Sequence, residues 1–168
     1  MKLLSIAIPC YNSQDYMAHC IESLLPGGED VEILIVNDGS KDDTAKIADE
    51  YAAKYPTIVK AIHKENGGAP SARNTAIEIA KGEYMYFMDS DDWAEPTMLE
   101  DMYKLAKRDN AQLVVAGFFI DTYYDKEHYV TDDYVVEDAV YPDKESFRRN
   151  AYKLFDKNLL YTPWNKLF

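Results

Sequence analysis

Three aspartates, Asp89, Asp91 and Asp92, stand within four residues, directly after an apolar run of strand length. Carboxylates this close repel one another, and a divalent cation with oxygen ligands relieves that repulsion. Open α/β sheets bind ligands at the carboxyl ends of their strands. The pattern therefore favours a metal site at the end of a buried strand. A solvated acidic turn that caps the next helix is the alternative, and these residues alone leave it open.

The composition indicates a single globular domain with an acidic surface. The chain has 168 residues, of which 47% are hydrophobic, and this is enough to bury a core. The formal net charge of −12 argues against a general binder of nucleic acid. An anionic ligand would need a metal or helix N-termini at its site. The fourteen tyrosines, most of them after residue 80, fit either a half-exposed binding surface or core packing.

The cysteines and histidines form no disulfide framework or zinc pattern. Cys10 and Cys20 are the two cysteines, which favours a reduced, cytoplasmic setting, and the histidines His19, His63 and His128 are scattered. The apolar run near the N-terminus is too short for a signal sequence or a membrane span. We therefore expect a cytoplasmic protein, and peripheral attachment to the inner face of the plasma membrane stays open.

Strand-like and helix-like segments alternate around the acidic cluster. Nearly continuous apolar runs are typical of parallel strands that are covered on both faces. The segments between them place apolar residues at helical spacing. This alternation predicts an α/β fold with a mainly parallel central sheet and helices on both faces. The expected strands are residues 3–8, 31–36, 58–62, 83–88 and 113–119.

Polar or glycine-rich loops follow these strands and should meet at one edge of the sheet. Pro9 ends the first strand because it has no N–H to donate, and Asn12 or Ser13 can cap the following helix. Ser40, followed three residues later by Asp43, resembles a capping box. The expected edge loops are residues 9–13, 37–40, 65–74 and 89–93.

The pattern changes at about residue 120. Tyr, Asp, Thr and Val between residues 121 and 143 predict an antiparallel hairpin that turns near Asp132 and Asp133. Residues 146–155 fit a helix. The last segment, residues 159–168, is apolar and aromatic, although a terminus is normally polar. It therefore has the composition of the interior of a fold.

Four segments in order and at the right spacing resemble the family 2 glycosyltransferases, which have the Rossmann-like GT-A fold. The match covers roughly residues 3 to 105, and each segment follows a predicted strand. Each segment alone is a weak signal, whereas the four together are highly specific. The final Thr162–Phe168 also resembles a segment of bacterial members. The four segments are Ile8–Asn12, Ile35–Thr44, Asn66–Asn74 and Met88–Asp92.

The resemblance implies a nucleotide-sugar donor, usually a UDP-sugar, and an acceptor that is a saccharide or a lipid-linked saccharide. Pro9, Tyr11 and Asn12 match the segment that lines the base, where an aromatic face can stack on uracil. An ordinary loop aromatic is the alternative for Tyr11. Asp38 matches the residue that accepts a hydrogen bond from the uracil N3–H. The alternative for Asp38 is a helix cap, for which Ser40 is better suited.

The same resemblance assigns the acidic cluster to the diphosphate. Arg73 matches a basic residue near the nucleotide, and a solvated helix charge is its alternative. Asp89 and Asp91 match the outer positions of an Asp-x-Asp motif, with Ser90 between them. Asp89 would contact the ribose or the metal shell, and Asp91 would bind Mg²⁺ or Mn²⁺ at the diphosphate. Asp92 either shares that role or caps the next turn.

An inverting transfer also needs a general base that deprotonates the acceptor hydroxyl. In the family this is an acidic residue well downstream of the Asp-x-Asp motif, and Glu95 and the later acids are poor substitutes. We therefore expect residues 1–168 to be one truncated domain that lacks the base, so that its catalytic residue is unknown. Residues 1–120 would form the nucleotide-binding core, and residues 121–168 would begin the acceptor side.

Two functions follow from the resemblance, and a third comes from the carboxylates alone. The first is an inverting, metal-dependent glycosyltransferase of cell-surface polysaccharide synthesis. The second is a fragment that binds UDP-sugar and metal without turnover. The third is a phosphoryl-accepting signalling domain, which fits poorly because the fifth expected strand supplies no obvious lysine to pair with the acids.

Overall fold

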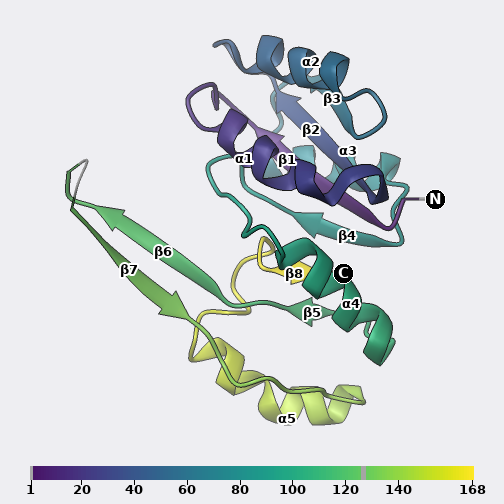
Figure 1. Cartoon of the computed structure of the whole chain (residues 1–168), viewed down its shortest axis with the longest axis vertical. Coiled ribbons are helices and arrows are strands. Elements are labelled where there is room, and N and C mark those ends of the chain that lie inside the picture. Colours follow the sequence, from purple (N-terminus) through teal and green to yellow (C-terminus); the bar gives the residue numbers. More distant parts are fainter. Residues whose placement is uncertain (1, 126–127) are drawn as a thin grey trace.

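The computed structural model describes residues 2–125 and 128–168, and its centre is a sheet covered by helices on both faces (Figure 1). Within the described residues the sheet has six strands in the order β3-β2-β1-β4-β8-β5. The sheet strands are β1 Leu4–Cys10, β2 Val31–Asp38, β3 Val59–Lys64, β4 Tyr84–Phe87, β5 Val114–Val115 and β8 Lys166–Leu167. The helices are α1 Met17–Leu24, the 3-10 helix η1 Leu25–Asp30, α2 Thr44–Lys54, α3 Ala69–Ile79, α4 Met98–Asp109 and α5 Lys144–Phe155.

The strands β1 to β4 are parallel to one another, as the sequence predicts. Ile6 in the middle of β1 lies opposite Ile33 of β2 on one side and Tyr86 of β4 on the other. The β-branched and aliphatic runs favour this arrangement because both faces of each central strand are buried. The carboxyl ends of all four strands therefore point to the same edge.

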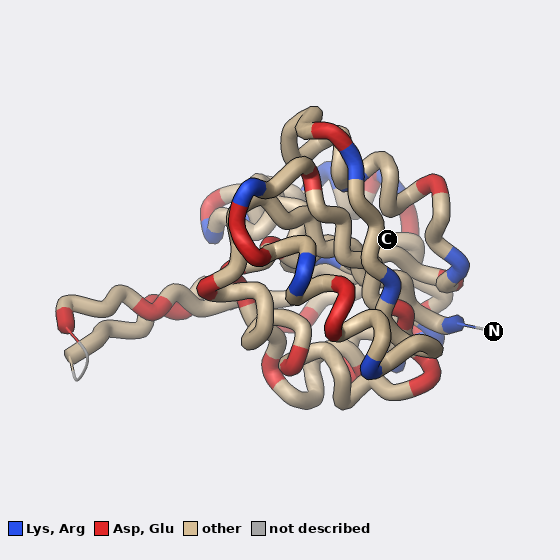
Figure 2. Tube along the Cα trace, turned by 90° about the horizontal axis from the view of Figure 1, so that it is seen from above, with Lys and Arg blue, Asp and Glu red and all other residues tan. Residues whose placement is uncertain are grey.

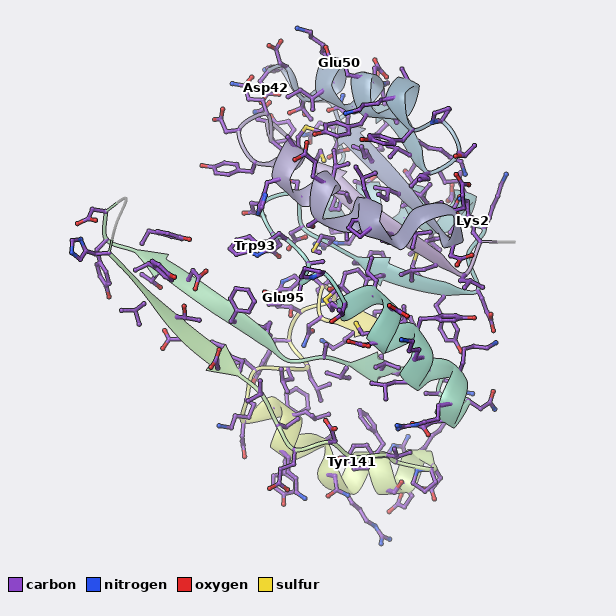
Figure 3. The ribbon with its side chains drawn as sticks, in the orientation of Figure 1. Lys2, Asp42, Glu50, Trp93, Glu95 and Tyr141 are labelled. Atoms are coloured by element: carbon purple, nitrogen blue, oxygen red, sulfur yellow. The ribbon has the colours of Figure 1, made fainter. Side chains whose placement is uncertain are left out.

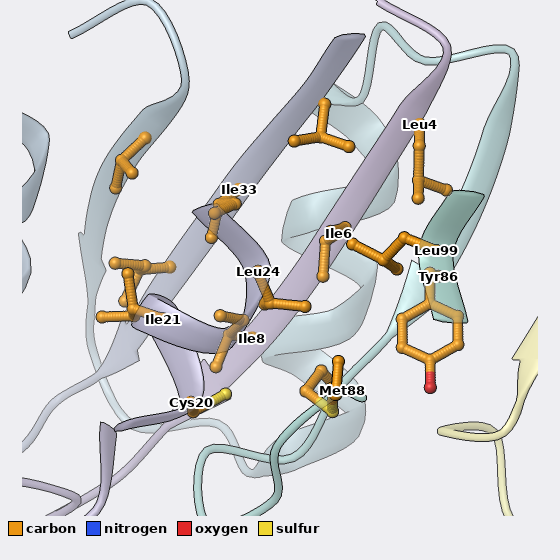
Figure 4. Packing of buried hydrophobic residues seen from close by; sticks show 14 of the residues in the cluster. Leu4, Ile6, Ile8, Cys20, Ile21, Leu24, Ile33, Tyr86, Met88 and Leu99 are labelled. Atoms are coloured by element: carbon orange, nitrogen blue, oxygen red, sulfur yellow. The ribbon is translucent and has the colours of Figure 1, made fainter. Parts of the chain in front are cut away.

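The two faces of the sheet carry cores of unequal size. The larger core packs α1, α2 and α4 against one face, and it includes Ile6, Ile8, Ile21 and Leu99 (Figure 4). On the other face α3 packs closely, because its small residues meet the apolar side chains of β2. The smaller core consists of Ala7, Leu34, Val36, Ala72 and Ala76.

A buried carboxylate fixes the end of the sheet opposite the predicted site. Glu32 in β2 accepts hydrogen bonds from Ser5 Oγ at 2.7 Å and from Lys60 Nζ at 2.5 Å. Gly82 N in turn donates to Ser5 Oγ at 2.7 Å, and a Cβ on Gly82 would lie 2.4 Å from Ser5 N. This close approach anchors the start of β4, and so it sets where the acidic cluster at its other end lies.

The prediction of one continuous fifth strand over residues 113–119 is wrong. β5 is only two residues long, and the chain leaves the sheet at Gly117, where a Cβ would lie 2.8 Å from Tyr134 O. β8 lies between β4 and β5 and is antiparallel to both. The apolar terminal segment thus contributes a strand to the interior of the sheet, in keeping with its composition.

The hairpin predicted after the core exists, but its turn lies elsewhere. It consists of β6, Phe118–Tyr123, and β7, Tyr129–Tyr134, so the turn falls between Tyr123 and Tyr129. Asp132 and Asp133 lie within β7 and pair with β6. The hairpin begins at residue 118, slightly before the expected boundary at 120, and it projects from the rest of the chain (Figures 1 and 2).

The helix expected over residues 146–155 begins two residues earlier, at Lys144. Asp143 caps it, because its carboxylate accepts from Ser146 N at 2.7 Å while Ser146 Oγ accepts from Asp143 N. Among the described residues, no helix is both long enough and apolar enough to cross a lipid bilayer.

Candidate functional site

The loops after β1, β2, β3 and β4 meet at the carboxyl edge of the sheet, as the sequence predicts. Hydrogen bonds join the loop after β1 to two of the others. The hydroxyls of Ser13 and Ser90 lie 2.8 Å apart and link it to the loop after β4. Asn12 N donates to Ser40 Oγ at 3.0 Å and links it to the loop after β2.

Two further hydrogen bonds complete a closed ring of loop contacts. Asn66 Nδ2 donates to Asp38 O at 3.0 Å and joins the loop after β3 to the end of β2. Arg73 Nη2 from α3 donates to Asp89 Oδ1 at 2.7 Å and joins α3 to the loop after β4. The four loops are therefore held together before any ligand is bound.

The Ser40 hydroxyl accepts the hydrogen bond from Asn12 N in the ring of loops and does not cap the next helix. The predicted capping box is therefore wrong. The N-cap of α2 is Asp43, whose side chain makes no capping hydrogen bond. The adjacent Asp42 accepts from Thr44 N at 3.0 Å instead. The predicted cap of α1 is also wrong, because its N-cap is Tyr16, without a side-chain hydrogen bond.

Asp38 has a structural role that the sequence did not reveal. It is 2% exposed, and its carboxylate accepts from Lys64 Nζ at 2.6 Å, from Gly67 N at 3.0 Å and from Gly68 N at 2.7 Å. Burial alone would raise the pKa of Asp38, but these hydrogen bonds lower it below its usual value. Asp38 is thus ionised, and it positions the glycine loop that leads into α3. Asp38 could accept a hydrogen bond from uracil only through a carboxylate lone pair that these three donors leave unused.

Asn37, which the sequence analysis did not assign to the site, fixes the tautomer of a histidine. Its Oδ1 accepts from Ser40 N at 3.0 Å, so its Nδ2 is left to donate to His63 Nδ1 at 3.1 Å. His63 Nδ1 must then be an acceptor, and Nε2–H donates to Asp49 Oδ1 at 2.9 Å. The sequence feature that could have identified Asn37 is its position as a polar residue at the end of a buried strand.

Arg73 presents an unused donor at the predicted site. Its Nε is buried, and the described residues give it no hydrogen-bond partner. A buried, unsatisfied donor is costly unless a ligand or water accepts from it. Because Nη2 of the same guanidinium holds Asp89, this donor lies beside the acidic cluster. The alternative of a simple solvated helix charge does not fit this geometry.

The acidic cluster keeps the repulsion that its sequence predicts. Burial and the charges of Asp91 and Asp89 raise the pKa of Asp92 to about 6. Asp91 is exposed, and Asp92 N donates to Asp89 O at 3.1 Å in a tight turn. The described residues contain no group of three or more His, Cys, Asp or Glu side chains arranged to hold a metal. A divalent cation here would therefore need phosphate oxygens and water as further ligands, which is how Mg²⁺ usually binds.

The loop after β1 presents an accessible aromatic ring. Tyr11 is 51% exposed, and its backbone N donates to Ser13 Oγ at 3.2 Å. Asn12 has a left-handed φ of 52°, which asparagine tolerates, and its Oδ1 accepts from Lys41 N at 2.9 Å. Pro9 lies half-buried in β1, opposite Val36. Tyr11 is therefore available to stack, whereas Asn12 mainly fixes the loop.

Trp93 lies at this edge and was not assigned a role from the sequence. Figure 3 shows it between the edge loops and the hairpin. Its ring centroid lies 5.5 Å from that of His19 and 5.8 Å from that of Phe119. The sequence feature that could have identified Trp93 is its position directly after the acidic cluster. Through its contact with Phe119, Trp93 connects the acidic loop to the start of β6.

The two cysteines take no part in nucleophilic or metal chemistry here. Burial raises the pKa of the Cys10 thiol to about 12 and that of the Cys20 thiol well above its usual value. Both are free and buried, and Cys20 Sγ donates to Asp89 O at 3.5 Å. Both thiols are therefore neutral near pH 7 and act as packing groups under the acidic loop.

Two hollows of the described surface lie away from this edge. One, of about 700 Å³, is lined by Lys2, Glu29, Asp30 and Lys81 near the chain start. The other, of about 540 Å³, lies between α5 and the terminal segment. Neither contains a residue of the loop ring.

Comparisons with known proteins agree with this geometry. Residues 5–168 match the profile of glycosyl transferase family 2. The putative glycosyltransferase EpsH of Bacillus subtilis is 36% identical over 98% of this chain and 46% of its own length. The poly(ribitol-phosphate) beta-glucosyltransferase of Bacillus spizizenii is 40% identical over 67% of this chain and 18% of its own length. The chain thus spans less than half the length of these curated relatives.

Solved structures show the same fold. S. aureus TarS, residues 1–349, in complex with UDP superposes with a TM-score of 0.62 at 29% identity, over 68% of this chain and 35% of that one. A second TarS structure holds UDP-GlcNAc. The mainly parallel α/β sheet, the ring of edge loops and the family profile lead to one conclusion: the chain belongs to glycosyltransferase family 2, with a GT-A-like fold.

Proposed function

We propose that the protein transfers a sugar from a UDP-sugar to a hydroxyl of a saccharide or lipid-linked saccharide, with inversion and with a divalent metal. The observation that carries this proposal is the closed ring of loops, which brings Tyr11, Arg73, Asp89 and Asp91 to one edge. Uracil recognition needs a stacking surface, and a diphosphate needs a cation and hydrogen-bond donors.

Each residue of the proposed site has a chemical role that its surroundings support. The exposed ring of Tyr11 stacks on uracil, and Pro9 lines the base from the end of β1. The buried Nε of Arg73 donates to a phosphate or ribose oxygen of the donor, and this satisfies its missing hydrogen bond. Asp89, held by Arg73 through Oδ1, has Oδ2 left for the ribose or the metal shell, beside Ser90. Asp38 keeps the glycine loop in place under the nucleotide.

Asp91 and Asp89 are the residues that would hold Mg²⁺ or Mn²⁺. Hard carboxylate oxygens suit these ions, and a cation here would offset the repulsion that raises the pKa of Asp92. When bound, such an ion stabilises the charge that develops on the UDP leaving group. Arg73 adds a fixed positive charge on the same side.

The general base is not assigned to any residue of this chain. Glu95 is an exposed residue of the segment before α4, and it is not assigned as the base. We propose that residues 1–120 form the donor-binding part and residues 121–168 begin the acceptor side. A chain that binds UDP-sugar and metal without turnover is the second candidate function, because an inverting transfer needs a general base and no residue is assigned to that role here.

We place this activity in the cytoplasm, at or near the inner face of the plasma membrane, in the synthesis of a cell-surface polysaccharide. The name of one relative, a poly(ribitol-phosphate) beta-glucosyltransferase, supports a role in the glycosylation of a polymer at the level of the family. The net charge of −12 supports a donor held by local contacts and a metal, not by a general positive field.

Titration of the protein with UDP, with and without Mn²⁺, tests the proposal. We expect Mn²⁺ to tighten UDP binding, and Asp91→Asn to abolish that effect. Asp101→Asn is the matched control, because it removes the same charge from an exposed position on α4. The proposal would be contradicted if the unmodified protein did not bind UDP, or if its affinity for UDP were the same with and without Mn²⁺.

A further inference from the structure

We propose that one face of the β6–β7 hairpin, continued by Trp93, binds the saccharide acceptor. This face, called the aromatic stripe below, consists of Trp93, Phe119, Tyr123 and Tyr129. The inference rests on the proposed function, because it assigns the second substrate of that reaction. The preferred occupant is a neutral saccharide chain.

The cross-strand pairing of the hairpin defines the face. Directly opposite residues in an antiparallel pair share a face, and the faces alternate along each strand. Phe119 and Tyr123 therefore point to the same side of β6, and Phe119 contacts Trp93. The face thus continues from the acidic loop outward along the hairpin. Its pairs are Phe119 with Asp133, Asp121 with Thr131, and Tyr123 with Tyr129.

The aromatic rings of the stripe are accessible. Tyr123 and Tyr129 stack with centroids 5.2 Å apart, yet they are 60% and 55% exposed. Trp93 is 38% exposed. Exposed aromatic clusters mark interaction surfaces, because solvent exposure of large rings is unfavourable. The C–H face of a pyranose ring packs on such rings while its hydroxyls remain hydrated.

Polar groups between the rings complete a surface suited to sugar. Asp121 and Asp133 lie on the same face, and Thr131 Oγ1 donates to Asp121 Oδ1 at 2.5 Å. Carboxylates accept hydrogen bonds from hydroxyls, as saccharide recognition requires. The other face differs, because it exposes the aliphatic Ile120 and Val130. An aromatic surface with interspersed carboxylates fits a saccharide better than a purely apolar partner.

The negative charge of the hairpin disfavours anionic acceptors. Residues 118–143 contain one lysine, Lys126, against eight acidic residues, and Figure 2 shows acidic positions along the projecting arm. A polyanionic polymer would be repelled, and a second copy of the chain would bring like charges together. The acidic residues are Asp121, Asp125, Glu127, Asp132, Asp133, Glu137, Asp138 and Asp143.

The length and direction of the stripe suit a chain that leads to the donor. Phe119 and Tyr123 are four residues apart along β6, which is roughly 13 Å in a strand. The inner end is Trp93, two residues after Asp91. A short oligosaccharide on the stripe would therefore keep its terminal sugar near the proposed donor site while the rest lies on the hairpin.

The test measures binding of cello- and chito-oligosaccharides of increasing length by calorimetry, in the presence of UDP and Mn²⁺. Tyr123→Ala and Tyr129→Ala are expected to weaken binding about five- to tenfold. Ile120→Ala and Val130→Ala, on the opposite face of the same strands, are the matched controls and should leave it unchanged. A polyol-phosphate polymer should not bind. The affinity for UDP should be the same in all these variants.

The outcomes separate this inference from the proposed function. Loss of UDP binding in the unmodified protein would remove the proposed function itself. Intact UDP binding with no binding of either oligosaccharide would overturn the stripe alone. Equal weakening by substitutions on both faces would also overturn it, because it would indicate a general loss of the hairpin. A change of oligomeric state in Tyr123→Ala would reassign the stripe to self-association.

Discussion

Arg73 Nη2 donates to Asp89 Oδ1 at 2.7 Å, and this ion pair joins α3 to the loop after β4. The two side chains are partly buried, so the pair is shielded more than a surface salt bridge. The same guanidinium holds its Nε in a buried position, where the described residues offer it no acceptor. Arg73 thus positions one member of the acidic cluster, and its Nε is the donor that we propose for the nucleotide.

Arg73→Lys is expected to weaken UDP binding about tenfold while the protein stays folded. Lysine keeps the positive charge for Asp89 but has no equivalent of Nε, so one hydrogen bond to a charged group is lost, worth about 1.5 kcal/mol. Calorimetric titration with UDP and Mn²⁺ measures the change. Arg108→Lys on α4 is the control, because Arg108 is exposed and pairs with the adjacent Asp109. An unchanged affinity in Arg73→Lys would show that Nε does not contact the nucleotide.

Gly39→Ala is expected to destabilise the protein by about 1–3 kcal/mol and to weaken UDP binding. Gly39 has a φ of +73°, and a Cβ there would lie 2.8 Å from Asn66 N, so the ring of loops must shift. Gly28→Ala separates the two effects, because Gly28 has a φ of +59° but open space around it. Thermal unfolding and UDP titration of both variants provide the measurement. Equal losses of stability and UDP affinity in the two variants would mean that the approach of residue 39 to Asn66 N contributes nothing.

The parallel sheet and the meeting of its loops were predictable because they depend on local patterns. Continuous apolar runs identify buried strands, and parallel strands bring their carboxyl ends to one edge. The positions of Arg73, Asp89 and Tyr11 at that edge follow from this alone. The contact between Asp38 and the glycine loop was not predictable, because Gly67 and Gly68 lie far along the chain and act through backbone N–H groups.

The hairpin shows where sequence patterns lose information. Both of its faces are largely exposed, so no buried face fixes the register, and the turn was placed within what proved to be β7. The division of residues 113–119 between two sheets depends on Gly117 and on the insertion of β8 from the end of the chain. A periodicity argument detects neither, because both are long-range contacts.

Asp38→Asn is expected to lower stability by about 2 kcal/mol at pH 7 and to loosen the glycine loop. The folded protein lowers the pKa of Asp38, so its stabilising contribution is complete above the unfolded value of about 4. It is lost as the pH falls through the folded value. The difference in unfolding free energy between the two proteins should therefore shrink in acid. A difference that stays constant down to acid pH would contradict the assignment.

Asp92→Asn is expected to stabilise the metal-free protein near neutral pH. Burial and the charges of Asp91 and Asp89 raise the pKa of Asp92 to about 6, so the folded state binds a proton that the unfolded state has already lost. Stability therefore falls as the pH rises from about 4 through 6, and it stays lower above that range. Removing the charge should recover roughly 1 kcal/mol at pH 7.5, since exposure of the side chain reduces the full electrostatic value. Urea unfolding with a chelator at pH 4.5 and at pH 7.5 measures this, and the gain should nearly vanish at the lower pH. A gain of equal size at both pH values would mean that Asp92 does not carry the repulsion of the cluster.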